Sequence, residues 1–302
     1  MKKFINSSGN SAPRDPFITK HHGKYYRCYT ESSDSVFIAC ADSLEALAKA
    51  EGTEVYVPEE GKEYSKQLWA PELHIIDGKC YIYVACDDGN NHNHRMYALE
   101  NGSDDPVLPY KMHGKITDAS DKWAIDGTVV NINNTNYFIW SGWEGCENVC
   151  QNLYIAEMKS PFELYPERTL ISSPEYAWEK LGSTGAPGSP FINEGAFGVH
   201  HEDKFYLLYS AAGSWCKDYC ISYLLLTGDD PLNASSWEKA KDPVLCANEL
   251  LKGAGHCSVI EEEGKNIIFF HAWDKEETNV TWNTVSVWQG ELSFDNNGVV
   301  IK

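Results

Sequence analysis

A pattern of short strands recurs five times along the chain and constrains its fold more than any other feature of the sequence. In each copy a turn rich in Gly, Asn or Asp leads into a run of apolar and aromatic residues of strand length. The five runs are HHGKYYRCYT (21–30), IDGKCYIYVA (76–85), NNTNYFIWSG (133–142), HEDKFYLLYS (201–210) and EEGKNIIFFH (262–271). A less regular segment precedes each run and a further strand follows it, so each copy contains at least three strands.

The spacing of the copies predicts the architecture. When Asp15, Glu72, Asp126, Glu194 and His256 are taken as equivalent positions, successive copies are 57, 54, 68 and 62 residues apart. A repeat of this size that is made only of strands is typical of a four-stranded propeller blade. We therefore predict an all-β fold, a five-bladed β-propeller with four-stranded antiparallel blades around a central channel. We expect a single domain over residues 1–302, with blades that start near residues 12, 66, 121, 190 and 252.

Charge and composition exclude several classes of partner. The chain has 25 Lys and Arg against 44 Asp and Glu, a net charge of −19. Because no basic stripe is present to neutralise phosphates, neither nucleic acid nor an anionic membrane surface is an expected partner. No stretch approaches the ~20 apolar residues of a membrane span. Helical signal is confined to a short segment at 42–50.

The N-terminal segment and the cysteines bear on location. Lys2 and Lys3 are not followed by the apolar run of a signal peptide, so we expect a cytoplasmic protein unless a signal has been removed. The ten cysteines form no zinc-binding pattern and are expected to pack as reduced thiols.

The five equivalent positions predict a catalytic site. In a propeller the innermost strands run beside the central axis, so equivalent residues on them converge into one ring. Here four of these positions hold carboxylates and the fifth holds His256. Like charges that lie close together raise one another's pKa, and glycoside hydrolysis needs one protonated and one ionised carboxyl group. Opposite sides of a ring favour the wide separation, about 6.5–9.5 Å, that is typical of inverting enzymes.

Five segments in order, at blade spacing, resemble glycoside hydrolase family 43, the five-bladed arabinofuranosidases, xylosidases and arabinanases. They are RDPF (14–17), LWAPELH (68–74), AIDGTV (124–129), NEGAFG (193–198) and GAGHCSV (253–259). The resemblance implies an inverting hydrolase in which Asp15 is the base that activates water and Glu194 is the general acid. It implies that Asp126 raises the pKa of the acid and orients it. We expect Glu72, which follows Pro71, to belong mainly to the structure of the ring.

The same resemblance suggests residues that bind substrate or a metal ion. No cofactor is required, and His256 resembles the axial histidine that holds water or a calcium ion in the channel. The expected substrate-binding residues are Arg14, Phe17, Trp69, Ile125, Trp143 and His256.

The segments IWSGWEG (139–145) and QNLYIAEMKSPFEL (151–164) resemble those of exo-acting α-L-arabinofuranosidases more than those of xylosidases. We therefore expect release of terminal α-L-arabinofuranosyl residues from arabino-oligosaccharides or arabinoxylan fragments, with a small oligosaccharide as the binding partner. A β-xylosidase, an endo-arabinanase and a non-catalytic sugar-binding propeller remain alternatives, although a binding module has no need of three mutually repelling carboxylates. An invertase-like enzyme fits less well, because no Glu-Cys acid motif is present. The sequence carries no indication of oligomeric state.

Overall fold

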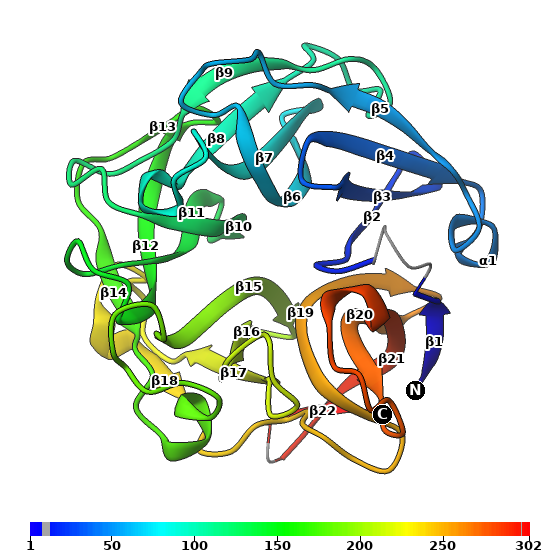
Figure 1. Cartoon of the computed structure of the whole chain (residues 1–302), viewed down its shortest axis with the longest axis vertical. Coiled ribbons are helices and arrows are strands. Elements are labelled where there is room, and N and C mark those ends of the chain that lie inside the picture. Colours follow the sequence, from blue (N-terminus) through cyan, green and yellow to red (C-terminus); the bar gives the residue numbers. More distant parts are fainter. Residues whose placement is uncertain (8–12, 297) are drawn as a thin grey trace.

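The computed structural model describes residues 1–7, 13–296 and 298–302, and their regular secondary structure consists mainly of β-strands joined by turns and loops (Figure 1). The strands form five antiparallel units in chain order, arranged around a common centre (Figure 1). The first unit comprises β2 (Phe17–His21), β3 (Lys24–Glu31), β4 (Ser35–Ala41) and β5 (Gly52–Tyr56). The second comprises β6 (Lys66–Ile76), β7 (Lys79–Asp87), β8 (Arg95–Glu100) and β9 (Lys111–Lys115). The third comprises β10 (Ala124–Ile132), β11 (Thr135–Gly142) and β12 (Cys150–Ser160), with β13 (Glu163–Leu164) and β14 (Thr169–Ser172) both paired to β12.

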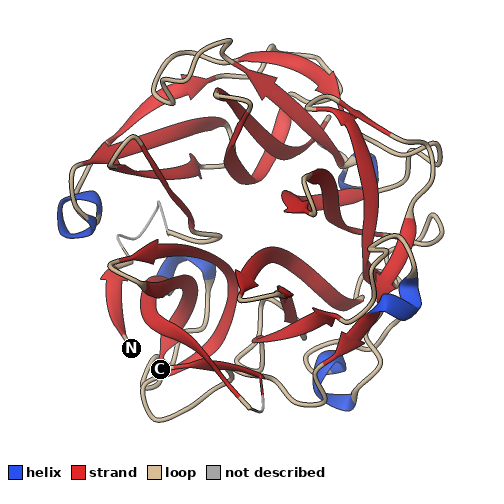
Figure 2. Cartoon of the chain, turned by 180° about the vertical axis from the view of Figure 1, so that it is seen from behind, coloured by secondary structure: helices blue, strands red, loops and turns tan. Residues whose placement is uncertain are grey.

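The remaining two units follow the same plan. The fourth comprises β15 (Phe191–His201), β16 (Lys204–Ala211), β17 (Cys220–Leu226) and β18 (Trp237–Lys239). The fifth comprises β19 (Leu251–Glu262), β20 (Lys265–Asp274) and β21 (Ser286–Asp295), with β22 (Gly298–Ile301) and β1 (Lys2–Ile5) both paired to β21. Helices are short and connect strands (Figure 2); they are α1 (Leu44–Leu47), η1 (Asn91–Asn93), η2 (Ala177–Lys180), η3 (Ala234–Ser236) and η4 (Trp282–Thr284). Among the described residues, no helix is both long and apolar enough to cross a membrane.

The all-β prediction is confirmed, and the first, second and fourth units are four-stranded antiparallel blades as predicted, whereas the third and fifth units each have one additional short strand. The first strands of the last four units begin at Lys66, Ala124, Phe191 and Leu251, close to the starts predicted near 66, 121, 190 and 252. The start predicted near residue 12 lies outside the described residues. The strand β1 was not predicted; it pairs with β21 beside β22, so the N-terminal segment completes the last unit.

Hydrogen bonds join the units into four sheets and not into one closed sheet. A short parallel pairing of Cys150 and Gln151 with Phe191 and Ile192 links the third unit to the fourth. Elsewhere the units are held together by side chains, since each of five apolar clusters lies between two neighbouring units. The last cluster packs Phe269 of the fifth unit with residues of the first, and each such buried side chain contributes about 1.5–3 kcal/mol.

A β-bulge interrupts the first strand of each of the last four units. The register shifts fall between Trp69 and Glu72, Ile125 and Thr128, Glu194 and Phe197, and Gly255 and Ser258. Inside these bulges, residues with left-handed backbone are Ala70 (φ 44°), Asp126 (φ 53°), Gly195 (φ 58°) and His256 (φ 51°). In the first unit, Asp15 has the same backbone conformation (φ 49°) just before β2. Bulges bend a strand and re-aim its side chains, and they are frequent beside active sites.

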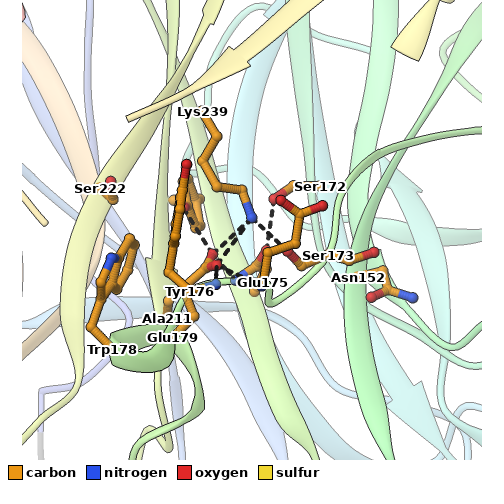
Figure 3. Close-up of polar contacts among 12 residues, drawn as sticks. Asn152, Ser172, Ser173, Glu175, Tyr176, Trp178, Glu179, Ala211, Ser222 and Lys239 are labelled. Atoms are coloured by element: carbon orange, nitrogen blue, oxygen red, sulfur yellow. Dashed lines mark hydrogen bonds and ion pairs between the residues drawn. The ribbon is translucent and has the colours of Figure 1, made fainter. Parts of the chain in front are cut away.

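A buried carboxylate anchors the segment that leads into β15. Glu179 in η2 is fully buried, and its carboxylate is paired with Lys239 Nζ at 2.9 Å (Figure 3). The same carboxylate accepts hydrogen bonds from the Tyr209 hydroxyl at 3.0 Å and from the Asn193 amide at 2.9 Å. A buried charge is tolerated only when it is paired and hydrogen-bonded in this way. Because Asn193 precedes Glu194, the cluster fixes the strand that carries one of the predicted site carboxylates.

Candidate active site

A cavity of about 350 Å³ is lined by residues from all five units. Its volume lies within the range of small-molecule binding sites. The predicted site residues that line it are Arg14, Asp15, Trp69, Ile125, Asp126, Glu194 and His256. The fold thus brings the three predicted catalytic carboxylates to one cavity, although the chain separates them widely.

Asp15 lies among cationic and imidazole groups. Its Oδ1 is 3.3 Å from Nδ1 of His256 and 3.3 Å from Nδ1 of His271, and its Oδ2 is 4.0 Å from Nε of Arg14. Burial by itself raises the pKa of Asp15, but His256, His271 and Arg14 together outweigh burial and hold this pKa well below its usual range. Asp15 is therefore ionised at neutral pH.

Asp126 and Glu194 lie in the opposite electrostatic environment. Both are buried, and Asp126 Oδ2 is 3.7 Å from Nδ1 of His256, which thus contacts two aspartates. Burial, followed by the charge of Asp15, raises the pKa of Asp126 well above its ordinary value. Burial, followed by the charge of Asp126, raises the pKa of Glu194 from 4.5 to about 8. One cavity therefore contains an ionised carboxylate and a carboxyl group that retains its proton at neutral pH, the arrangement that acid–base catalysis needs.

The glycine after Glu194 is required by its surroundings. Gly195 has left-handed backbone, and a Cβ at this position would lie 3.1 Å from the imidazole of His256. Its backbone N–H donates a hydrogen bond to Asp126. Gly195 thus lets the third and fifth units approach the fourth closely enough to place Asp126, His256 and Glu194 together.

Three other predicted residues lie away from this cavity. Glu72 is buried and bonded to His74 Nε2 at 2.7 Å, and it does not line the cavity. Phe17 packs on His74 with ring centroids 5.2 Å apart and lines a different pocket. Trp143 is 2% exposed and stacks behind Trp123, with centroids 4.7 Å apart, so Trp123 faces the cavity in its place. Phe17 and Trp143 were predicted to bind substrate, but neither side chain lines this cavity.

Several residues at the site escaped the sequence analysis. Trp282 in η4 lines the cavity, and the Arg14 guanidinium lies 5.5 Å from the centre of its ring. This tryptophan stands outside the repeated strand pattern, so spacing could not identify it. Tyr219 and His271 contact Glu194 and Asp15 without lining the cavity. His271 is the last residue of the fifth repeated run. A polar residue that ends an otherwise apolar run was the one sequence feature that could have identified it as a site residue.

The residues around His256 do not form a ligand set for direct coordination of calcium. Calcium takes six to eight oxygen ligands, whereas His256 offers nitrogen and its Nδ1 already contacts Asp15 and Asp126. Within the described part of the chain, one group of three His, Cys, Asp or Glu side chains has ligand atoms close enough together to hold a metal ion. It consists of His21, His22 and Asp104. These are mostly exposed, and their imidazoles already hydrogen-bond to Asp104. Calcium held through water at His256 stays a prediction.

Comparisons with known proteins identify the family. The model of the family "Glycosyl hydrolases family 43" matches residues 7–298. An extracellular exo-α-(1→5)-L-arabinofuranosidase from Streptomyces avermitilis is 31% identical over 85% of this chain and 54% of its own length. Alpha-L-arabinofuranosidase B from Pyricularia oryzae is 32% identical, with the same coverage of both chains. The chain therefore spans about half the length of these two relatives. Proteins named as probable endo-acting arabinosidases match at lower identity.

A solved structure with the same fold gives independent support. The crystal structure of an α-L-arabinofuranosidase from Lactobacillus brevis superposes with a TM-score of 0.87 and 27% identity, over 99% of this chain and 94% of that one. Its match extends over all five units, and the β-propeller fold is thereby supported.

The comparisons overturn the expected location. A cytoplasmic protein was predicted because no signal peptide follows Lys2 and Lys3. The Streptomyces avermitilis relative is named an extracellular enzyme, which points to secretion. The prediction of a cytoplasmic location was wrong, because an N-terminal segment of a few residues does not reveal how a related enzyme is exported.

The matched family model covers nearly the whole chain, and the buried carboxylates of the cavity lie in the segments that first suggested the resemblance. The chain belongs to the glycosyl hydrolases family 43.

Proposed function

We propose that this chain is the catalytic domain of an inverting, exo-acting glycoside hydrolase that releases terminal α-L-arabinofuranosyl residues from arabino-oligosaccharides or arabinoxylan fragments. The five antiparallel units would be the blades of a single five-bladed propeller, and the cavity would hold the terminal sugar. Two relatives carry arabinofuranosidase names, which supports this choice of sugar. Because this chain covers only about half the length of these relatives, the activity and the substrate of the whole protein are part of this proposal.

The observation that carries the proposal is the opposite charge state of Asp15 and Glu194 in one cavity. In the proposed step Asp15 accepts a proton from water as the water oxygen bonds to the anomeric carbon. Glu194 gives its proton to the glycosidic oxygen as the bond between this oxygen and the anomeric carbon breaks. Attack and departure on opposite faces of the sugar invert the anomeric configuration. Water is the only co-reactant.

The other residues of the cavity would support this step. Burial, reinforced by the charge of Asp126, raises the pKa of Glu194 and keeps this group protonated near neutral pH. His256 Nδ1 lies between Asp15 and Asp126 and separates the two charges. Trp69, Trp123 and Trp282 line the cavity and provide the apolar surfaces that sugar rings require.

The proposal is tested by product analysis. The enzyme is incubated with linear arabino-oligosaccharides and xylo-oligosaccharides while NMR follows the anomeric configuration of the first product. We expect free β-L-arabinofuranose as the initial product from arabino-oligosaccharides, with slow or no release of xylose. Release of internal oligosaccharides would identify an endo-acting enzyme, and release of xylose a β-xylosidase. Sugar binding without any turnover would identify a binding module and refute the proposal.

A further inference from the structure

A tyrosine outside the cavity is bonded to the proposed acid. Tyr219 lies immediately before β17, and its side chain is fully buried. Its hydroxyl donates a hydrogen bond to Oε1 of Glu194 at 2.8 Å. Tyr219 does not line the cavity, whereas Glu194 does, so the tyrosine approaches the carboxyl group from behind the cavity wall.

The surroundings of Tyr219 fix the direction of this hydrogen bond. Ser210 Oγ accepts the backbone N–H of His256 at 2.7 Å and also hydrogen-bonds the Tyr219 hydroxyl. Because Ser210 Oγ already accepts from the backbone, its own proton is available to the tyrosine oxygen, and the proton of Tyr219 is left for Glu194. Burial, followed by the charge of Glu194, raises the pKa of Tyr219 well above 10, so the hydroxyl stays a donor at every pH of interest.

The ring of Tyr219 occupies a place that the fold provides for it. A Cβ at Gly255 would overlap the ring, so residue 255 has to be glycine for the tyrosine to fit. On another side the ring stacks on His271, with centroids 5.6 Å apart and planes inclined by 16°. His271 in turn contacts Asp15. Tyr219 is therefore linked to Glu194 directly and to Asp15 through His271.

We propose that Tyr219 is a positioning residue that holds Oε1 of Glu194 from behind the cavity, so that Oε2 is the oxygen that delivers the proton to the substrate. This inference rests on the proposed function, because it assigns a task to Glu194 as the acid. A carboxyl group bound at one oxygen has one orientation and one site for its proton, which aligns that proton with the leaving oxygen.

The same hydrogen bond has a titration consequence with a definite sign. A hydrogen bond to the ionised carboxylate is stronger than one to the neutral acid, so it lowers the pKa of Glu194 and opposes the effect of burial. Removal of the hydroxyl therefore raises this pKa. For a reaction that requires protonated Glu194, the decline of activity at alkaline pH then moves to higher pH.

The test is the variant Tyr219→Phe, which removes one oxygen atom and keeps the ring. We expect the alkaline limb of kcat/KM to move upward by up to about one pH unit. We also expect kcat on arabino-oligosaccharides to fall by about 10-fold or more, with a smaller loss on an aryl arabinoside whose leaving group needs little protonation. The double variant Tyr219→Phe/Glu194→Gln should be no slower than Glu194→Gln alone, since the tyrosine acts only through Glu194.

Tyr209→Phe is the matched control. Tyr209 is a fully buried tyrosine of the same unit, and its hydroxyl also donates to a buried glutamate, Glu179, at 3.0 Å. Its removal should lower the melting temperature by a similar amount and leave the alkaline limb in place. A shift in both variants would indicate a general effect of lost stability and overturn the inference.

An assay that does not depend on turnover separates this inference from the proposed function. The pKa of Glu194 is measured by NMR in protein with carbon-13-labelled glutamate side chains, with Glu194→Gln to assign the signal. A higher pKa in Tyr219→Phe than in the unmodified protein supports the inference even if no arabinoside is cleaved. An unchanged or lower pKa would overturn it even in an active arabinofuranosidase.

Discussion

The charge of Asp126 provides the sharpest test of how the site works. Burial, followed by this charge, raises the pKa of Glu194 from 4.5 to about 8, a stabilisation of the protonated form by about 5 kcal/mol. Burial is the larger cause of this rise and the charge of Asp126 is the next, while the hydrogen bond from Tyr219 and the charge of His256 oppose both. Because the acid must be protonated, activity should fall as the pH rises through about 8. In Asp126→Asn, which keeps the shape and removes the charge, the decline should begin at a lower pH, by on the order of one unit.

The assay is the pH dependence of kcat/KM on an aryl α-L-arabinofuranoside, which reports on the free enzyme. Glu72→Gln is the matched control, because it also removes one negative charge from the ring but at a residue that bonds to His74 and lies outside the cavity. We expect its alkaline limb to stay close to that of the unmodified enzyme. An unmoved limb in Asp126→Asn would refute the reasoning, since it would mean that Asp126 is uncharged when Glu194 titrates.

Three further substitutions test separate parts of the structure. Asp15→Asn should lower kcat by about 10³-fold while oligosaccharide binding, measured by calorimetry, is retained; a loss of binding with kcat preserved would contradict its role as base. Glu194→Gln should lose far more rate on an oligosaccharide than on an activated aryl arabinoside, and equal losses in parallel steady-state assays would argue against its role as acid. Lys239→Met leaves the carboxylate of Glu179 buried without its cation and should lower the free energy of unfolding by about 3–5 kcal/mol in urea titrations, whereas a change below about 1 kcal/mol would show that this ion pair does not stabilise the fold.

The strand pattern predicted the parts of this molecule that depend on periodicity. Runs of apolar and aromatic residues that follow turn residues identified the repeated strands, and the spacing of these runs placed Asp15, Asp126 and Glu194 at equivalent positions of the repeat. These equivalent positions lie at the same end of the first strand of each unit, and all three side chains line one cavity. Most residues of β7, β11, β16 and β20 are buried on both faces of the strand, which is why four of the five runs read as continuous apolar segments in the sequence.

The residues that were misplaced or missed depend on directions that periodicity does not encode. Trp143 and Trp123 both lie near the site, but only the stacking of one ring behind the other decides which of them faces the cavity. Tyr219 precedes a strand and reaches Glu194 because Gly255, on the next unit, leaves room for its ring. The contact between Tyr219 and Gly255 joins residues from different units and has no signature in either segment alone.

The ring itself is aligned by backbone conformation more than by residue type. The left-handed position of the bulge is occupied by Asp126 in the third unit and by His256 in the fifth, but in the fourth unit Gly195 takes it and the carboxylate is one residue earlier. In the second unit Ala70 takes it, and Glu72, two residues later, is directed to His74 instead of the cavity. A left-handed conformation costs a residue other than glycine about 1–2 kcal/mol. Asp126 and His256 keep this strained conformation because the bulge turns their side chains to the centre, where a carboxylate and an imidazole are needed. Glu72 is not at the left-handed position of its bulge, and its carboxylate pairs with His74 of the same strand. Its spacing in the sequence therefore matches that of the other ring residues, although its side chain does not line the cavity.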